Sequence, residues 1–187
     1  MKTRLILLTF TFVFGCTGPI NKEAASLFQS LRDSLSVTVY PVHVIILPKS
    51  VQTDTKLQNE VVMYLNSNDY AHAVTTTMDV NIPVAPSKNQ AKMFKESALN
   101  FAQQVSNQNI STPYALLVET LSWHNESNMG GIHYYVADTM GHVVAGGLTN
   151  SHWEEFISVS PRTRQDGIKV AFNMLDKALS PQVLDKK

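Results

Sequence analysis

Residues 37–47 read VTVYPVHVIIL, which is the most strand-like stretch in the body of this 187-residue chain. Its β-branched and aromatic residues fit the pleated surface of a sheet. Pro41 cannot donate a hydrogen bond to a neighbouring strand, so the first half is expected at a sheet edge or a bulge. Residues 44–47 are continuously apolar, which indicates a strand covered on both faces.

A helix and a second strand are expected to follow this stretch. Pro48 ends the first strand. Thr53 or Asp54 can cap a helix over residues 55–66, because a short polar side chain accepts hydrogen bonds from the first turn. Residues 71–77 predict the next strand, and strands joined by such a helical crossover are expected to be parallel.

The second half of the chain predicts a long helix and three antiparallel strands. Ser87 is expected to cap the helix, which extends to about Gln104. The strands are expected at residues 114–123, 132–137 and 142–148, with polar turns between them.

The end of the domain is marked by two further signals. Gly146 and Gly147 are expected to mark a bulge in the last strand, and Ser160 and Pro161 are expected to begin the final helix. In chain order the elements are strand, helix, strand, helix, three strands and helix. This order predicts an α/β (α+β) domain with a single mixed five-stranded sheet and helices packed on it.

The first 15 residues, MKTRLILLTFTFVFG, have the layout of a secretory signal. Lys2 and Arg4 form a positive head, an apolar and threonine run of ten residues follows, and Gly15 precedes Cys16. The run is shorter than the roughly 20 residues that a membrane span needs. The expected organisation is a signal peptide over residues 1–15, a lipidated tether over 16–22, one domain over 23–180 that begins with a short helix over 23–35, and a flexible tail over 181–187.

The end of this leader resembles the lipobox of bacterial membrane lipoproteins. Val13, Gly15 and Cys16 match its order of an aliphatic residue, a small residue, Gly or Ala, and then the cysteine, while Phe14 is bulkier than the residue usual at the second position. The resemblance implies that Cys16 carries acyl chains that anchor the protein. Thr17 stands where an Asp would favour the inner membrane, so the resemblance implies the outer membrane, facing the periplasm. The alternative is a chance cysteine beside an ordinary signal cleavage site.

Composition narrows the class of protein. Hydrophobic residues make up 44% and charged residues 16% of the chain, which suits a globular domain with a sizeable core. Loss of Lys2 and Arg4 with the leader leaves 13 basic against 15 acidic side chains. No dense basic patch is present, so nucleic acid is not expected as a partner. Beyond Cys16 there is no cysteine, so the domain must be stable without disulfides.

Three segments resemble, in pattern, the amino-terminal domain of TolB and the curli-secretion type of periplasmic lipoprotein. They are the strand VIILP at residues 44–48, the strand YALLVE at residues 114–119, and the hairpin VADTMGHVV at residues 136–144. These families act as binding or assembly components of the envelope. The resemblance therefore implies a binding role in the envelope, by analogy of fold.

Histidines supply the best candidates for a metal or acid–base site. His133 and His142 flank the turn that follows Asp138 and could face each other, with Asp138 or Glu119 nearby. The favoured interpretation is that these residues occupy the solvent face of a half-buried sheet. No HExxH or cysteine ligand, no Gly-x-Ser-x-Gly elbow and no phosphate-binding glycine loop occurs, so neither a metal nor a cofactor is expected.

A second candidate is the loop Ser151–Phe156, which precedes the final helix. Its two aromatic and two acidic side chains, beside a histidine, can form a partner-binding surface. The alternative is that Trp153 and Phe156 fold back and cover the sheet edge. The candidate partner-binding residues are His152, Trp153, Glu154, Glu155 and Phe156.

The sequence thus predicts a non-enzymatic bacterial envelope lipoprotein, anchored through Cys16, that binds a protein partner in envelope assembly, secretion or transport. The first alternative is a periplasmic metal-dependent enzyme that uses His133, His142 and Asp138. The second is a binder of a small ligand, with a pocket between the three-stranded meander and the final helix.

Overall fold

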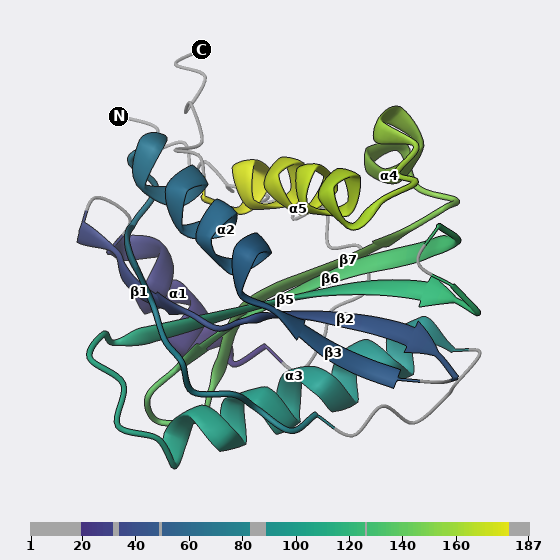
Figure 1. The fold of residues 1–187 in the computed structure, drawn as a ribbon. Helices are drawn as coiled ribbons and strands as arrows, with labels where there is room; N and C mark the ends of the chain where they lie inside the picture. Colours follow the sequence, from purple (N-terminus) through teal and green to yellow (C-terminus); the bar gives the residue numbers. More distant parts are fainter. Residues whose placement is uncertain (1–19, 32–33, 49, 83–88, 126, 180–187) are drawn as a thin grey trace, which may run out of the picture.

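A computed structural model describes residues 20–31, 34–48, 50–82, 89–125 and 127–179. The expected signal peptide, Cys16 and the tail at 181–187 lie outside these residues. Helices lie on both faces of one mixed sheet, which makes three layers (Figure 1). The elements are α1 Lys22–Ser30, β1 Ser36–Val39, β2 Val42–Leu47, β3 Ser50–Asp54, α2 Thr55–Ser67, β4 His72–Thr75, α3 Gln90–Ser106, β5 Tyr114–Trp123, β6 Met129–Asp138, β7 Val143–Asn150, α4 Glu154–Val159 and α5 Arg164–Leu179.

The mixed α/β architecture is as predicted, but the sheet has seven strands rather than five. β1 pairs in parallel with β4 across the α2 crossover, and β5, β6 and β7 form the expected antiparallel meander. The two extra strands have separate causes. The stretch at residues 37–47 is split into β1 and β2, and β3 forms an antiparallel edge strand beside β2 where the sequence pattern showed only a helix cap.

The split in residues 37–47 is a one-residue bulge at Tyr40 and Pro41. Val39 pairs with Leu116 and His43 pairs with Glu119, so four steps along this segment oppose three steps along β5. The prediction of a bulge is confirmed, while the edge alternative is wrong because β4 covers β1. The extra residue also exchanges the two faces of the sheet for the side chains that follow it. As a result, His43 of β2 points toward α3.

Helix boundaries differ from the predictions where the cap was misassigned. α2 begins after Asp54 as expected, with the Asp54 carboxylate accepting hydrogen bonds from the amides of Lys56 and Leu57 at 3.0 Å each. α3 begins at Gln90 and is capped by Asn89, not by Ser87, which is outside the described residues.

The segment between the meander and the last helix was expected to be a loop but contains the short helix α4. Ser160 ends α4 in a left-handed conformation with φ +47°, so it does not begin the last helix, which starts at Arg164. At the other end, α1 stops at Ser30 instead of residue 35. None of the described helices is long and apolar enough to span a membrane.

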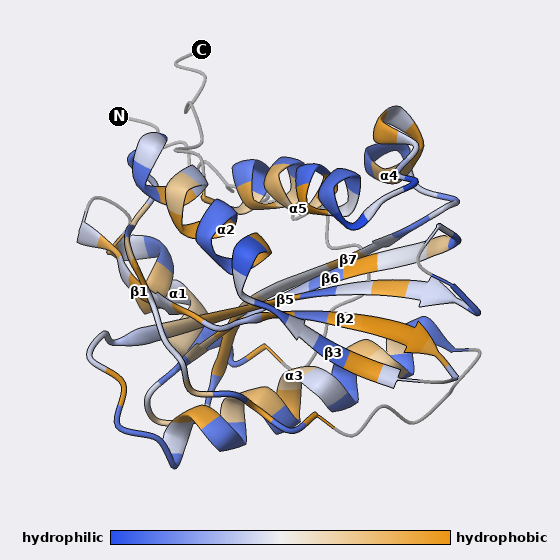
Figure 2. Cartoon of the chain, in the orientation of Figure 1, coloured by the Kyte–Doolittle hydropathy of each residue, from blue (hydrophilic) through white to orange (hydrophobic). Residues whose placement is uncertain are grey.

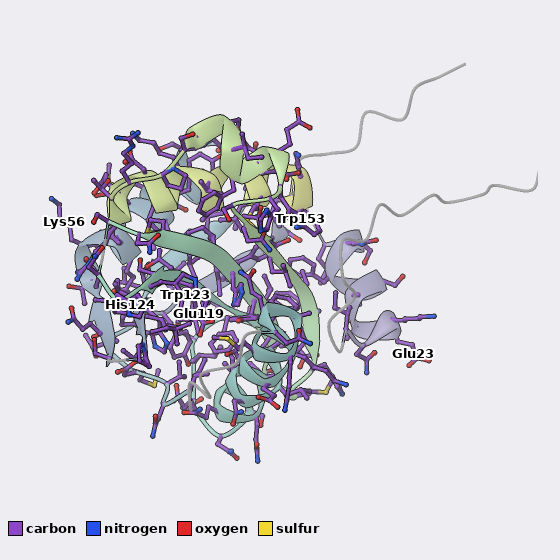
Figure 3. The ribbon with its side chains drawn as sticks, turned by 90° about the vertical axis from the view of Figure 1, so that its right-hand side faces the viewer. Glu23, Lys56, Glu119, Trp123, His124 and Trp153 are labelled. Carbon is purple, nitrogen blue, oxygen red and sulfur yellow. The ribbon has the colours of Figure 1, made fainter. Side chains whose placement is uncertain are left out.

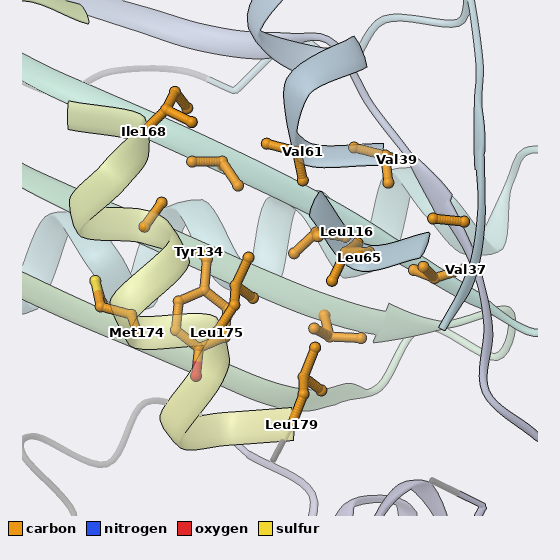
Figure 4. Close-up of a cluster of buried hydrophobic side chains, with 14 of the residues drawn as sticks. Val37, Val39, Val61, Leu65, Leu116, Tyr134, Ile168, Met174, Leu175 and Leu179 are labelled. Carbon is orange, nitrogen blue, oxygen red and sulfur yellow. The ribbon is translucent and has the colours of Figure 1, made fainter. Parts of the chain in front are cut away.

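Apolar cores fill both faces of the sheet. Above the sheet, α2 and α5 cover Leu116 and Tyr134, with Val61 and Leu175 packed between them (Figure 4). Below it, α3 covers Leu117, Tyr135 and Leu148. Hydrophobic and hydrophilic residues alternate along the helices, and β2 is almost wholly apolar (Figure 2). The α3 face of β6 is therefore buried, which contradicts the prediction that His133 faces solvent.

Gly146 and Gly147 do not form the expected bulge. They pair regularly with Tyr135 and Tyr134, and the bulge lies instead at Val144. A Cβ atom on Gly147 would lie 2.5 Å from Cε1 of the Tyr134 ring. The glycine is thus required because an aromatic side chain of the neighbouring strand crosses its backbone.

Candidate functional site

Three ionisable residues form a row across adjacent strands on the α3 face of the sheet. Register places His43 of β2 and His133 of β6 on either side of Glu119 of β5. Glu119 Oε2 lies 3.3 Å from His133 Nδ1, and Glu119 Oε1 lies 3.8 Å from His43 Nδ1. All three side chains are at most 2% exposed. We call this set the polar row; Figure 3 shows Glu119 in the interior of the molecule.

Tyr135 connects two members of the polar row. Its hydroxyl lies 2.7 Å from Glu119 Oε2 and 2.9 Å from His133 Nδ1. The hydroxyl donates to the carboxylate, which can only accept, and accepts the Nδ1 proton of His133. Burial, followed by the charge of Glu119 and this hydrogen bond, raises the pKa of Tyr135 well above its ordinary value. Tyr135 therefore stays protonated and acts as a fixed donor.

Gln90 of α3 fixes the tautomer of His133 from the opposite side. Gln90 Nε2 lies 3.3 Å from the carbonyl oxygen of Thr149, which identifies this atom as the amide donor. The same nitrogen lies 3.2 Å from His133 Nε2, which must then accept the hydrogen bond. Gln90 Oε1 in turn accepts from Asn150 Nδ2 at 2.8 Å. With Nε2 as the acceptor, the donating N–H of the His133 ring is assigned to Nδ1.

The other end of the polar row is less complete. His43 Nε2 lies 3.3 Å from Oδ1 of Asp79, whose side chain is 58% exposed. His43 Nδ1 and Glu119 Oε1 face each other but have no hydrogen-bond partner among the described residues. A buried polar atom without a hydrogen-bond partner lowers the stability of the fold by about 1–3 kcal/mol, so this end of the polar row destabilises the interior.

The candidate cluster of His133, His142 and Asp138, which was the disfavoured alternative, is not formed. His142 Nδ1 is 2.9 Å from Asp138 Oδ2 at the β6–β7 turn, where Asp138 also accepts from the His142 amide. His133 lies far from this turn. It stands four residues before Ala137, the residue of β6 that pairs with Val143 beside His142, and four residues span about 13 Å of strand. Among the described residues no group of three His, Cys, Asp or Glu side chains is placed to hold a metal ion.

A pocket of about 630 Å³ opens at the end of the sheet where β2 and β5 end and β6 begins. Its apolar side is built from the ends of β2 and β5 and the first turns of α3, and its polar side from amide and hydroxyl side chains. The small-ligand alternative placed a pocket between the three-stranded meander and the final helix, whereas this pocket lies against the start of α3. It is lined by Leu47, Asn89, Gln90, Met93, Leu121, Trp123, Gly130, Asn150, Ser151 and His152. We call it the Trp123 pocket.

Gly130 and Gly131 make room for two side chains of the Trp123 pocket. A Cβ atom on Gly130 would lie 2.5 Å from Nε1 of Trp123, and one on Gly131 would overlap Nε2 of Gln90. Gly130 is also the bulged residue opposite Leu121 and Ser122. This glycine pair therefore serves close packing of side chains over the backbone.

The segment predicted to bind a partner is divided between the surface and the core. Phe156 is buried in the α5 core, as the alternative interpretation expected. Glu155 is paired with Lys177 at 2.6 Å, and the hydrogen bond from Lys177 lowers the pKa of Glu155. His152 and Glu154 are exposed, and Trp153 is half-buried. Figure 3 shows Trp153 well apart from Trp123.

Several of these residues were not singled out from the sequence. His43 was noted only as one of the six histidines of the chain and was assigned to no site, and Gln90 lies where the helix was expected to be under way already. A detectable signal was present for Gln90, because Asn89 is a good helix cap and places Gln90 at the first turn. Nothing in the sequence indicated that Asp79 would meet His43, since the two are joined only through the tertiary fold.

Comparisons with known proteins do not assign a family. No family model and no curated protein matches this chain. A dodecamer of a PelC point variant from Paraburkholderia phytofirmans is 16% identical over 88% of this chain and 92% of that one, with a TM-score of 0.35. The hypothetical protein CT253 from Chlamydia trachomatis is 12% identical over 77% of this chain and 91% of that one, with a TM-score of 0.30. At these TM-scores neither structure defines a shared fold, and the resemblance to TolB and the curli-secretion lipoproteins stays a prediction.

Proposed function

We propose that the protein is a non-enzymatic bacterial envelope lipoprotein, anchored through Cys16, whose domain binds a protein partner. The observation that carries the proposal is the short distance between the anchor and the fold. Ile20 already forms a parallel bridge with Val143 of β7, and the amide of Asn21 donates to the Val143 carbonyl at 3.0 Å. Four residues from Cys16 reach at most about 14 Å, so the anchor would hold this edge of the domain close to the membrane surface.

Burial of the polar row supports a binding role over catalysis. General acid–base catalysis requires the ionisable group to come within hydrogen-bond reach of a substrate. Glu119, His43 and His133 are each covered by the sheet and α3, so a substrate has no direct access to them. The row is instead suited to holding three strands and a helix in one arrangement.

The surface proposed for the protein partner is the outer side of α4 and the turn before it. Phe156 in the core and the Glu155–Lys177 pair fix this helix to α5. The helix then presents Glu154 and Ile157, the latter 56% exposed, beside His152. An exposed apolar side chain beside charged and polar ones on a rigid support is typical of a contact surface.

The anchor is tested with Cys16→Ser and with labelled fatty acid. The wild-type protein should take up label and fractionate with outer membranes, and Cys16→Ser should take up none and leave the membrane fraction. Thr17→Asp is the matched variant: it should keep the label and move to the inner membrane. The lipid anchor would be excluded if the wild-type protein took up no label and the Cys16→Ser protein still fractionated with membranes.

The partner surface is tested separately by crosslinking in whole envelopes and mass spectrometry. A combined His152→Ala, Glu154→Ala and Ile157→Ala variant should lose the crosslinked species. Met63→Ala on α2, which removes a side chain that is 67% exposed, is the control and should keep it. Retention of the same crosslinks by the triple variant would place the partner elsewhere.

A further inference from the structure

The Trp123 pocket has the chemistry of a small-molecule site, and it shares only His152 with the proposed partner surface. Its volume of about 630 Å³ falls within the range of roughly 300–1,000 Å³ typical of sites for small ligands. Part of its wall is apolar and rigid, because Leu47, Met93 and Leu121 belong to one buried cluster between the sheet and α3. Such a wall is formed before any ligand arrives.

Trp123 supplies a flat aromatic surface at the pocket. It is the last residue of β5, and its side chain remains 39% exposed although the residues before it on the same strand are buried. The close approach of its Nε1 and Cδ1 atoms to the Gly130 backbone, 2.5 and 2.7 Å from a Cβ placed there, fixes the position of the ring. An exposed indole held in place by a neighbouring glycine can stack on the C–H face of a ring at little entropic cost.

The polar part of the pocket is neutral and able both to donate and to accept. Asn89 and Asn150 contribute amides and Ser151 contributes a hydroxyl, while Gln90, whose two N–H groups are used by Thr149 and His133, can offer only its carbonyl oxygen; His152 is the one titratable residue among the ten lining residues. None of these ten is Asp, Glu, Lys or Arg. A charged ligand would lose its hydration without gaining an ion pair, which is costly, whereas hydroxyl groups match amides in both roles.

The amide of Asn150 is held in place before binding. Its Nδ2 donates to Gln90 Oε1 at 2.8 Å, and its Oδ1 accepts from the His152 amide at 3.0 Å. Gln90 is in turn fixed by His133 and Thr149. The polar side of the pocket is therefore supported by the polar row behind it, as expected of a pre-organised site.

We propose that the Trp123 pocket binds an uncharged saccharide, with one sugar ring stacked on Trp123 and its hydroxyl groups bonded to the amide and hydroxyl side chains. A sugar ring combines an apolar C–H face with a rim of groups that both donate and accept. These are the two surfaces that the pocket offers.

The test uses matched neutral and charged sugars and the purified protein. N-acetylglucosamine and glucose are the neutral probes, and glucosamine and glucuronate are their charged counterparts. In a two-dimensional NMR titration, the neutral sugars should shift the indole N–H signal of Trp123 and leave that of Trp153 in place. A single ring should bind with a Kd on the order of 1 mM, and each charged counterpart at least about tenfold more weakly.

Variants separate the pocket from the rest of the surface. Trp123→Ala should weaken binding of the neutral sugars by about tenfold or more, while Trp153→Phe should leave it unchanged. The wild-type titration keeps the test valid if Trp123→Ala fails to fold. The proposal is overturned if no neutral sugar perturbs Trp123 below about 100 mM, if the charged sugars bind as well as the neutral ones, or if folded Trp123→Ala binds normally.

Discussion

Glu119 and His133 lie directly opposite each other on β5 and β6, and both are almost completely excluded from solvent. The 3.3 Å between Glu119 Oε2 and His133 Nδ1, together with the bridging hydroxyl of Tyr135, makes the carboxylate the common acceptor of this region. Loss of the carboxylate would leave the Tyr135 hydroxyl without its acceptor in a low-dielectric interior.

Glu119→Ala is therefore expected to lower the free energy of unfolding by about 3 kcal/mol, as when one partner of a buried charged network is removed. Glu119→Gln, which keeps an acceptor oxygen, should cost less. Urea unfolding followed by circular dichroism measures both. The control is Glu96→Ala, whose exposed pair with Lys92 on α3 should contribute less than about 1 kcal/mol. Equal effects at positions 119 and 96 would contradict a structural role for the polar row.

The raised pKa of Tyr40 leads to a prediction for the free energy of unfolding at alkaline pH. Burial raises the pKa of Tyr40 to about 12, and its hydroxyl donates to Gln108 Oε1 at 2.5 Å. Since the folded state holds this proton more tightly than the unfolded state does, the contribution of Tyr40 is complete below about pH 10 and is lost as the pH rises through 12.

Tyr40→Phe should accordingly lose less stability than the wild type between about pH 10 and pH 12, although it starts lower at about pH 8 because a hydrogen bond is missing. Urea midpoints at about pH 8, 10 and 11 measure the difference. Parallel pH profiles for the two proteins would show that Tyr40 does not take part in this loss.

The close packing at Gly147 leads to a prediction of steric destabilisation when a side chain is added there. Gly147→Ala would bring a methyl group 2.5 Å from the Tyr134 ring and 3.2 Å from Met174 Cε, which should cost about 1–3 kcal/mol. In a Tyr134→Val background the same substitution should cost clearly less, because the ring that crosses the glycine is gone. Additive effects of the two substitutions in urea unfolding would rule out the steric explanation.

The cap that Asp54 forms at the start of α2 leads to a prediction for the stability of two variants at this position. Asp54→Ala removes the acceptor for the amides of Lys56 and Leu57 and should cost about 1 kcal/mol. Asp54→Asn keeps this acceptor and differs mainly in the pair with Arg164 at 3.6 Å, so it should stay within a few tenths of a kcal/mol of the wild type. A large loss of stability in Asp54→Asn would show that the ion pair with Arg164, and not the helix cap, accounts for the effect of Asp54→Ala.

Local signals in the sequence predicted those parts of the fold that depend on local chemistry. The strand at residues 132–137 and the Asp54 cap were recovered because alternation and capping are readable from neighbouring residues. The edge strand β3 was missed, because its residues are polar and exposed and it forms only through pairing with β2.

The candidate site was less predictable than the fold. His133 was assigned to solvent because a histidine on an alternating strand usually marks the exposed face, whereas here α3 buries that face as well. His43, Glu119 and Gln90 come from three elements that are distant in sequence, and only the sheet register and the position of α3 bring them together.

The bulge at Tyr40 and Pro41 also determines where relatives of this chain can differ in length. Loss of one residue at position 40 or 41 would join β1 and β2 into one regular strand, and His43 would still lie opposite Glu119. Loss of one residue within β2, between His43 and Leu47, would instead shift the following side chains to opposite faces. A one-residue gap in an alignment with a relative therefore belongs at positions 40–41, where evolution can shorten the chain without moving the histidine.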